Sequence, residues 1–152
     1  MEKNINIQVV SIKEELFSVS YENMPSSLEE AHAKLTHLLN IRFGIDEEKE
    51  LFKTNIWIKF QNKENVNPDS DSVVSFRMVY VLRIANIRSF LNTVDDTVEI
   101  SLPDGVWRTI LADVYATARA MLSVKLSGTP LHEFYLPFEG SKSLFENQLK
   151  RR

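Results

Sequence analysis

The chain has three histidines, His32, His37 and His132, whose rings could bind a metal ion or transfer a proton near neutral pH. His32 and His37 stand five positions apart. On a helix that spacing is poor for a shared metal ion, and on a strand it places the two rings on opposite sides of the sheet. No HExxH or similar pattern surrounds any of the three. The spacing therefore favours histidines on the surface or in the core over a metal site.

Acidic residues stand side by side at Glu14–Glu15, Glu29–Glu30 and Asp95–Asp96, and two carboxylates can act as general acid and general base. Neighbours in sequence rarely converge on one substrate atom, however. Nothing near these pairs indicates the desolvation that acid catalysis requires. We interpret the pairs as charges in solvated turns.

The glycine and cysteine contents exclude further kinds of site. With four scattered glycines the chain builds neither a GxGxxG loop nor a Walker loop for phosphate, and without cysteine it has no thiol nucleophile or thiolate metal ligand. The net charge of -3, with no basic stripe, argues against a nucleic-acid partner. We therefore expect no enzyme activity, no catalytic residue, no metal and no cofactor.

Length and hydropathy limit the number of domains and the compartments that are compatible with the sequence. A chain of 152 residues fits one domain, 1–152, with a single core. The N-terminal residues lack the features of a signal peptide, and no apolar run reaches the ~18 residues that a membrane helix needs. The absence of cysteine suits a reducing compartment. We expect a cytoplasmic protein that does not insert into membranes.

Apolar residues recur at every second position in the first half of the chain, which is the period of a strand with one buried face. The sets are Ile5, Ile7 and Val9; Leu39, Ile41, Phe43 and Ile45; and Phe52, Ile56, Ile58 and Phe60. Charged residues 13–15 interrupt the first set, and the polar segments 46–50 and 62–72 predict turns. A fourth run, 73–87, is apolar on both faces and predicts a strand covered on two sides.

The second half changes to helical spacing. A wide apolar stripe from Trp107 to Leu122 predicts the main helix, which Gly128 and Pro130 end, and residues 141–152 predict a short closing helix. Between the first two strands, serines stand three positions before glutamates in capping-box spacing. That segment is either a short helix or a long crossover loop. Strands first and helices last indicate an α+β domain with an antiparallel sheet.

The loop between the two helices, residues 127–140 (SGTPLHEFYLPFEG), carries more apolar area than a solvated connection needs. Together with the fourth strand, this surplus predicts self-association, a partner groove, or both. We expect Phe134 and Tyr135 to be exposed for binding and Phe138 to anchor the closing helix. A Phe134→Ser change should then weaken binding, and Phe138→Ser should lower stability.

The order of these parts resembles the SecB family of bacterial export chaperones over nearly the whole chain. The specific part is residues 102–149, with a helix, a Gly-Thr-Pro loop, a Leu-x-Pro element and a terminal helix in the family's order. The resemblance implies a four-stranded antiparallel Greek-key sheet followed by two C-terminal helices. It also implies assembly as a homotetramer, a dimer of dimers.

The resemblance implies site residues as well. Client grooves would be lined by Met24, Leu28, Leu39, Ile41, Phe43, Phe134, Tyr135, Phe145 and Leu149. Subunit contacts would come from Met78, Tyr80, Leu82, Trp107 and Val114. Glu14 or Glu15 matches the first acidic position of the face that docks on the SecA translocation motor. The other acidic positions fall near Ser18 or Ser20 and near Arg77 or Val79, and the chain ends in basic residues, which counts against that docking.

Three functions remain open at this point. The first is an ATP-independent holdase that binds unfolded or precursor polypeptides through apolar grooves and keeps them competent for export. The second is a SecB-like chaperone dedicated to one partner, such as an antitoxin. The third is a non-chaperone protein that binds a small ligand in an apolar pocket near His37 or His132.

Overall fold

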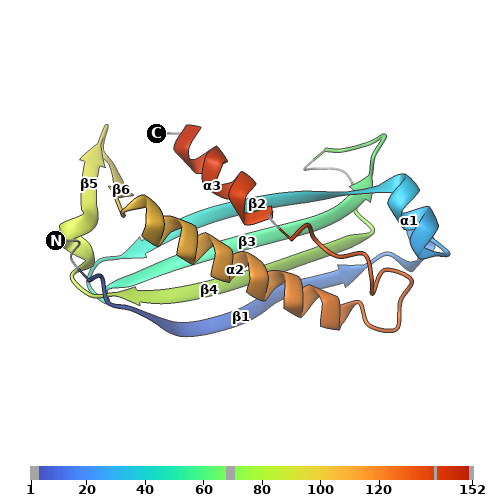
Figure 1. Cartoon of the computed structure of the whole chain (residues 1–152), viewed down its shortest axis with the longest axis horizontal. Coiled ribbons are helices and arrows are strands. Elements are labelled where there is room, and N and C mark those ends of the chain that lie inside the picture. Colours follow the sequence, from blue (N-terminus) through green and yellow to red (C-terminus); the bar gives the residue numbers. More distant parts are fainter. Residues whose placement is uncertain (1–3, 68–70, 139, 151–152) are drawn as a thin grey trace.

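The computed structural model describes residues 4–67, 71–138 and 140–150, with residues 148–150 described by their backbone alone. The long strands are β1 (Ile7–Val19), β2 (Leu35–Asp46), β3 (Leu51–Asn62) and β4 (Val74–Ile84). The helices are α1 (Leu28–Lys34), α2 (Asp104–Lys125) and α3 (Gly140–Lys150), and β5 (Leu91–Val94) and β6 (Thr97–Ile100) form a small hairpin (Figure 1). Short 3-10 turns cover Tyr21–Asn23 and Ile87–Phe90.

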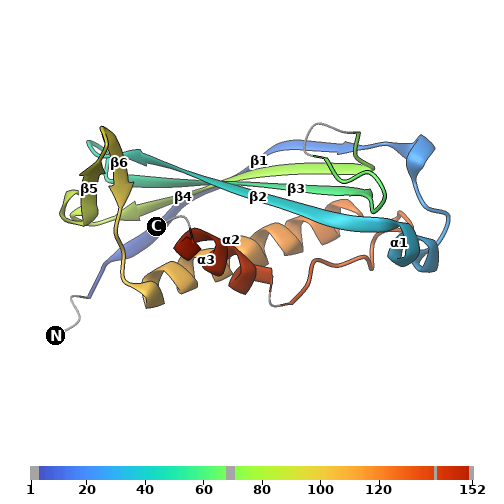
Figure 2. The same ribbon diagram turned by 90° about the horizontal axis from the view of Figure 1, so that it is seen from above.

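The four long strands pair antiparallel in the order β1-β4-β3-β2. This is a Greek-key order, because β2, β3 and β4 follow one another and β1 lies beside β4. The crossover that contains α1 joins β1 to β2. Figure 2 shows α2 and α3 on the same side of the sheet. The prediction of an α+β fold with a four-stranded antiparallel sheet and two C-terminal helices is confirmed.

Alternation along β3 defines the two faces of the sheet, as predicted. Its even-numbered residues from Phe52 to Phe60 are buried toward α2, and we call this side the helix face. Its odd-numbered residues point away from the helices, and we call that side the open face. The helix face includes Phe52, Ile56, Ile58 and Phe60, and the open face includes Lys53, Trp57, Arg77 and Arg83.

The two faces of β4 differ in burial. Its even-numbered residues are buried under α2, but Arg77 is partly exposed and Arg83 is exposed on the open face. In the described ranges no helix lies over that face (Figure 2). Val81 is nevertheless nearly buried, with Ser11 and Lys53 opposite it on the neighbouring strands. Within the described ranges, neighbouring side chains shield the apolar residues of this face, and the covering of β4 on its second side stays a prediction.

Residues 13–15 interrupt the alternation of β1 without ending the strand. Register shifts between Val9 and Ser11 and between Glu14 and Leu16 mark two bulges. A bulge adds one residue to one strand, so pairing resumes beyond it. Phe17 again lies opposite Phe76 on the helix face. The charged residues thus occupy an irregular part of an edge strand.

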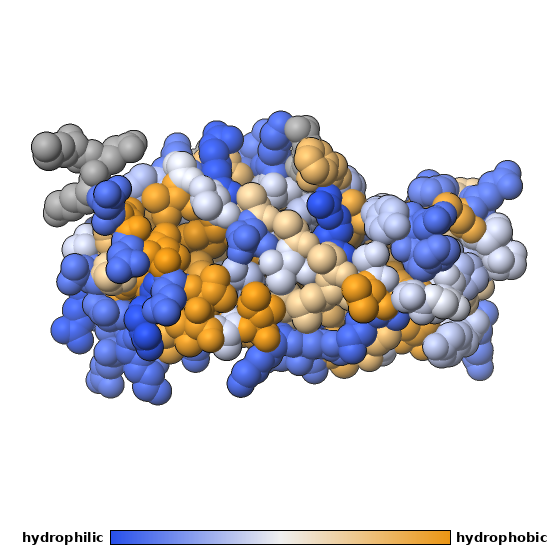
Figure 3. Space-filling model, turned by 60° about the horizontal axis from the view of Figure 1, so that its bottom comes forward, coloured by the Kyte–Doolittle hydropathy of each residue, from blue (hydrophilic) through white to orange (hydrophobic). Residues whose placement is uncertain are grey.

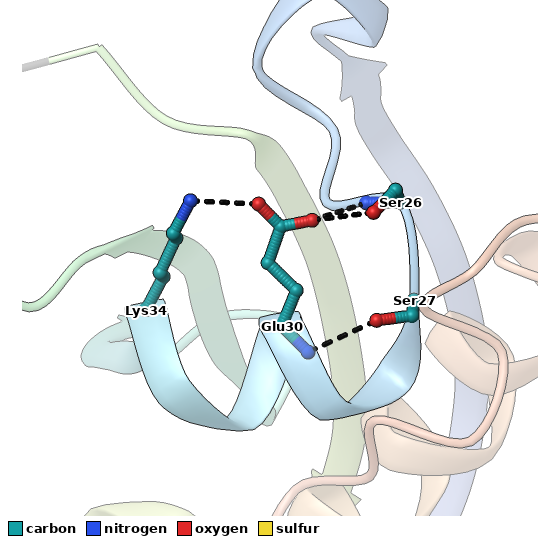
Figure 4. A network of polar contacts seen from close by, with 4 residues as sticks. All are labelled: Ser26, Ser27, Glu30 and Lys34. Atoms are coloured by element: carbon teal, nitrogen blue, oxygen red, sulfur yellow. Dashed lines mark hydrogen bonds and ion pairs between the residues drawn. The ribbon is translucent and has the colours of Figure 1, made fainter.

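The crossover contains a short helix, α1, that is closed at its start by a capping box (Figure 4). The Ser27 Oγ accepts a hydrogen bond from the Glu30 backbone N–H at 3.1 Å. In return, Glu30 Oε2 accepts from both the backbone N–H and the hydroxyl of Ser26 at 2.7 Å, and Lys34 Nζ lies 2.7 Å from Oε1. These partners, Lys34 first, lower the pKa of Glu30 to about 2. Of the two sequence alternatives for this segment, the helix is confirmed.

We expect Ser27→Ala to lower the free energy of unfolding by about 1 kcal/mol, because the Glu30 N–H loses its acceptor. Urea unfolding followed by circular dichroism measures this. Ser27→Asn is the matched control, since asparagine can take the same capping role and should retain most of the stability. Equal stability of the alanine variant and the unmodified chain would contradict the capping role.

α2 carries the predicted apolar stripe toward the sheet, and α3 packs beside it. The Tyr115 hydroxyl donates to the Pro137 carbonyl at 2.5 Å, and a Cβ at position 140 would clash with that same hydroxyl oxygen. Glycine at this position therefore lets α3 begin in close contact with α2. Neither α2 nor any other helix within the described ranges has the length and apolarity to span a membrane.

Candidate functional site

The loop between α2 and α3 folds into a compact turn that buries some of its apolar residues and exposes others. The N–H of His132 donates to the Thr129 carbonyl, and the N–H of Phe134 donates to the Leu131 carbonyl. Leu131, Phe134 and Leu136 are buried as a result. Tyr135 and Phe138 point outward, with exposed fractions of 57% and 83%.

Phe134 anchors this loop to the start of β2. Its ring stacks on His37 at 4.7 Å between centroids and meets the edge of Phe60 at 5.2 Å. The side chain of Phe134 is 4% exposed. The expectation of an exposed Phe134 and an anchoring Phe138 is therefore reversed, because the turn directs Phe134 inward. The exposure of Tyr135 agrees with the prediction.

The remaining predicted client residues come from the crossover, β2 and α3. Phe43 packs between Phe52 and Trp107, with centroids 5.3 and 5.2 Å away. Phe145 is buried, with the Arg108 guanidinium 4.1 Å from its ring centroid. Ile41 is also buried, whereas Met24, Leu28 and Leu39 are partly buried against the core. Leu149 lies in α3, and its side chain is outside the described residues.

These placements fill much of the predicted groove with the chain's own side chains. Phe134, Phe145 and Ile41 all belong to the core. Between the loop and α2, the space lined by His132 and Phe134 measures about 10 Å³. It holds no more than about one water molecule, which is too little for a small-molecule ligand beside His132.

The predicted subunit contacts also lie inside the chain. All five side chains are buried in the core between the sheet and α2. The five are Met78, Tyr80, Leu82, Trp107 and Val114. A side chain buried within one chain offers little surface to another, and the assignment of subunit contacts from the resemblance stays a prediction.

An open apolar groove lies instead on the other flank of α2, beside β1. It encloses about 860 Å³, and its lining includes Ile7, Val9, Leu82, Val106 and Ile110. Figure 3 shows apolar residues gathered on this side of the molecule, toward the end where β1 and α2 begin. We call this the β1–α2 groove.

The groove is open because α2 packs over β3 and β4, the two central strands. Val9 and Ile12 lie on the helix face of β1 but remain 48% and 40% exposed. β1 is also an edge strand, and in the described ranges no strand pairs with its outer edge. An edge strand can pair with an added chain through its backbone N–H and C=O groups. The groove thus combines apolar side chains with backbone hydrogen-bonding groups.

One hydrogen-bonded polar pair, the buried Tyr80 and the exposed Asp113, lines this groove. Tyr80 donates a hydrogen bond from its hydroxyl to the Asp113 carboxylate on α2. Burial and this hydrogen bond both raise the pKa of Tyr80. The hydroxyl therefore stays protonated at neutral pH, and its hydrogen bond is already made within the chain.

The ring of His37 is partly buried and packs against Phe60 and Phe134. Its Nε2 has no hydrogen-bond partner within the described part of the chain. Burial lowers the pKa of His37, and the nearby His32 lowers it further. No group of three or more metal-ligating side chains comes together in the described ranges, so His32 and His37 do not form part of such a cluster.

We expect stability to fall as the pH drops below the usual histidine pKa of ~6.5. The folded-state pKa of His37 is lowered, so the unfolded chain takes up the proton more readily, and stability is retained above that pH and lost below it. Urea midpoints between about pH 8 and pH 5 measure the slope. His37→Phe keeps an aromatic ring and should flatten the slope, whereas His132→Gln, at an exposed ring, should not. An unchanged slope in His37→Phe would contradict this role.

Glu14 and Glu15, the two candidates for the first acidic position of the motor-docking face, point to opposite sides of β1. Glu14 lies on the helix face, 2.8 Å from Lys125 Nζ at the end of α2. Glu15 sits in the second bulge, with its carboxylate 4.0 Å from the Arg77 guanidinium on the open face. Glu15 is therefore the one that lies on the outer surface of the sheet. Its negative charge is partly neutralised there.

Comparison with models of known protein families gives no match, and a search of curated proteins finds none either. The resemblance to the SecB family therefore stays a prediction from the sequence. The sequence prediction also missed the β1–α2 groove. Its one signal was the apolar set Ile5, Ile7 and Val9, but their exposure depends on where α2 lies across the sheet.

Proposed function

We propose that this chain is an ATP-independent, SecB-like holdase of the cytoplasm that binds unfolded or precursor polypeptides and keeps them competent for export. The observation that carries the proposal is the β1–α2 groove beside a free strand edge. A folded chain with an open apolar groove of about 860 Å³ has an unused surface of the kind that binds apolar segments.

The proposed mechanism is burial without chemical change. Apolar side chains of an extended client would contact Val9, Val106 and Ile110, at about 25 cal/mol for each Å² removed from water. The client backbone would add to the edge of β1, which any sequence can do because the hydrogen bonds use main-chain groups. Neither interaction depends on particular client residues. Binding would therefore be broad and would need no cofactor.

We propose a homotetramer as the functional form, as the resemblance implies. Several grooves held in one assembly would bind one long client at several points, which raises the overall affinity without new contacts. Light scattering coupled to size exclusion measures the mass. A strictly monomeric protein at micromolar concentration would overturn this part of the proposal.

The holdase activity is tested with a chemically denatured client protein diluted into buffer without ATP. We expect the purified chain to delay both aggregation and refolding of the client, in proportion to the molar ratio. A folded protein of similar size and net charge serves as the control. No delay at a molar excess would overturn the proposal. Affinity capture with mass spectrometry then distinguishes a general holdase, which would capture many precursor clients, from a chaperone dedicated to a single partner.

A further inference from the structure

The open face of the sheet carries a concentration of positive charge. Its basic residues are Lys13, Arg42, Lys53, Lys59, Arg77 and Arg83. The acidic residues that reach this side are Glu15, paired with Arg77, and Asp46, paired with Lys49 in the following turn. Within the described ranges no carboxylate lies within 4.0 Å of Lys13, Arg42, Lys53 or Arg83.

This concentration is opposite in sign to the rest of the chain. The whole sequence has 18 basic and 21 acidic residues. On the open face, six basic residues stand against the two acidic ones, Glu15 and Asp46. The open face is therefore positive in a chain that is acidic overall. Charge separated in this way steers and orients partners of opposite sign.

The basic residues follow the strand repeat. In the register of the sheet, five successive rows each contain at least one of them: Lys59, Arg77, Arg42 with Lys13, Lys53, and Arg83. Rows on one face of a sheet are two residues apart, or about 7 Å. An extended peptide with acidic residues at every second position presents its carboxylates at the same interval. The face and such a peptide match in spacing as well as in charge.

The centre of the face argues against a nucleic acid. Lys59 Nζ and the Arg77 guanidinium lie over the Trp57 ring, at 4.8 and 4.4 Å from its centroid. The indole N–H donates to the Ser75 hydroxyl at 3.0 Å. Proteins that bind single strands offer bare aromatic rings on which bases stack. Here cations already lie over the ring, so the tryptophan holds two cations in place instead.

We propose that the open face binds an extended acidic segment of another protein, with Arg77 and Lys59 at its centre and Lys13, Arg42, Lys53 and Arg83 along its length. In the free protein Glu15 holds Arg77 at 4.0 Å. An incoming carboxylate displaces Glu15 from the guanidinium. This surface lies on the side of the sheet opposite the β1–α2 groove, so the proposal does not depend on holdase activity.

The test uses a fluorescein-labelled peptide of alternating glutamate and serine, about ten residues long, which spans the rows when extended. Fluorescence anisotropy at low and high salt measures its affinity, and a peptide with glutamine in place of glutamate is the neutral probe. The test variant is Arg42→Glu with Lys53→Glu. The matched control is Arg88→Glu with Arg119→Glu, which changes the net charge equally but lies off the open face. Circular dichroism checks folding, and Arg42→Gln with Lys53→Gln replaces the test variant if the charge reversal does not fold.

We expect the test variant to weaken binding about tenfold and the control less than about threefold, with affinity falling as salt rises. Glu15→Gln should tighten binding about threefold, because Arg77 is released. Equal weakening by both double variants, or equal binding of the acidic and neutral peptides, overturns the proposal. So does tighter binding of a labelled single-stranded oligonucleotide or of anionic lipid vesicles. The test variant should still delay client aggregation, which separates this result from the holdase test.

Discussion

Replacing Phe134 with alanine is expected to lower the free energy of unfolding by about 3–5 kcal/mol, the usual cost of removing a buried phenylalanine ring. The ring is 4% exposed and contacts His37 and Phe60, so its removal leaves a cavity between the loop and the start of β2. The loop would also lose the side chain that anchors it there. We expect a lower urea midpoint and earlier proteolysis near residues 127–138.

Phe138→Ala is the matched control, because it removes the same ring from the same loop. Phe138 is 83% exposed, with the Arg119 guanidinium 5.6 Å from its centroid, and we expect a change of less than about 0.5 kcal/mol. Equilibrium urea unfolding of both variants measures the difference. A larger loss from Phe138→Ala than from Phe134→Ala would contradict the inward placement of Phe134.

Placing aspartate at both Val9 and Ile12 is expected to abolish the proposed delay of client aggregation. Each side chain is nearly half exposed beside the groove, so the change removes apolar contact area and adds charges that a bound apolar segment would have to desolvate. We expect client affinity to fall at least about tenfold, a difference of 1.4 kcal/mol. The free energy of unfolding should change by less than about 1 kcal/mol, because the exposed parts of both side chains contribute little to the core.

The β5–β6 hairpin offers a control of the same chemistry. Val94 and Val98 are 49% and 45% exposed, and aspartate at both positions adds the same charge away from the groove. Light scattering by a denatured client compares the two double variants. If both lose activity equally, general surface hydrophobicity rather than the groove holds the client, and the assignment of the groove fails.

The spacing of apolar residues predicted the strands and helices well where one face of the element is buried. The alternation of Phe52, Ile56 and Ile58 and the stripe on α2 both depend on a single nearby layer, so their periods report burial directly. The β5–β6 hairpin was missed because its strands are short and exposed. Its turn depends on positive φ at Asp95 and Asp96, of 47° and 62°, which aspartate tolerates but the sequence signals weakly.

The site was less predictable than the fold because it depends on long-range placement. Nothing local to Phe134 distinguishes it from Phe138, and the turn at Thr129 decides which ring faces the core. Similarly, Val9 is exposed because α2 crosses β3 and β4, which its own neighbours in sequence do not encode. The positive charge of the open face was also not predictable from local sequence, because its basic residues come from four different strands that are far apart in the chain.

The pairing of β1 with β4 has a consequence for synthesis. Ile7 pairs with Ile84, so the chain between them, including β2 and β3, must be made before this contact can form. Contacts across so long a segment form slowly, because closing the loop costs chain entropy. During synthesis, β2 and β3 can therefore pair before β4 exists, and β1 has no partner strand for its edges until β4 has been made. Until then, the charged residues 13–15 hinder the pairing of β1 with strands of other nascent chains.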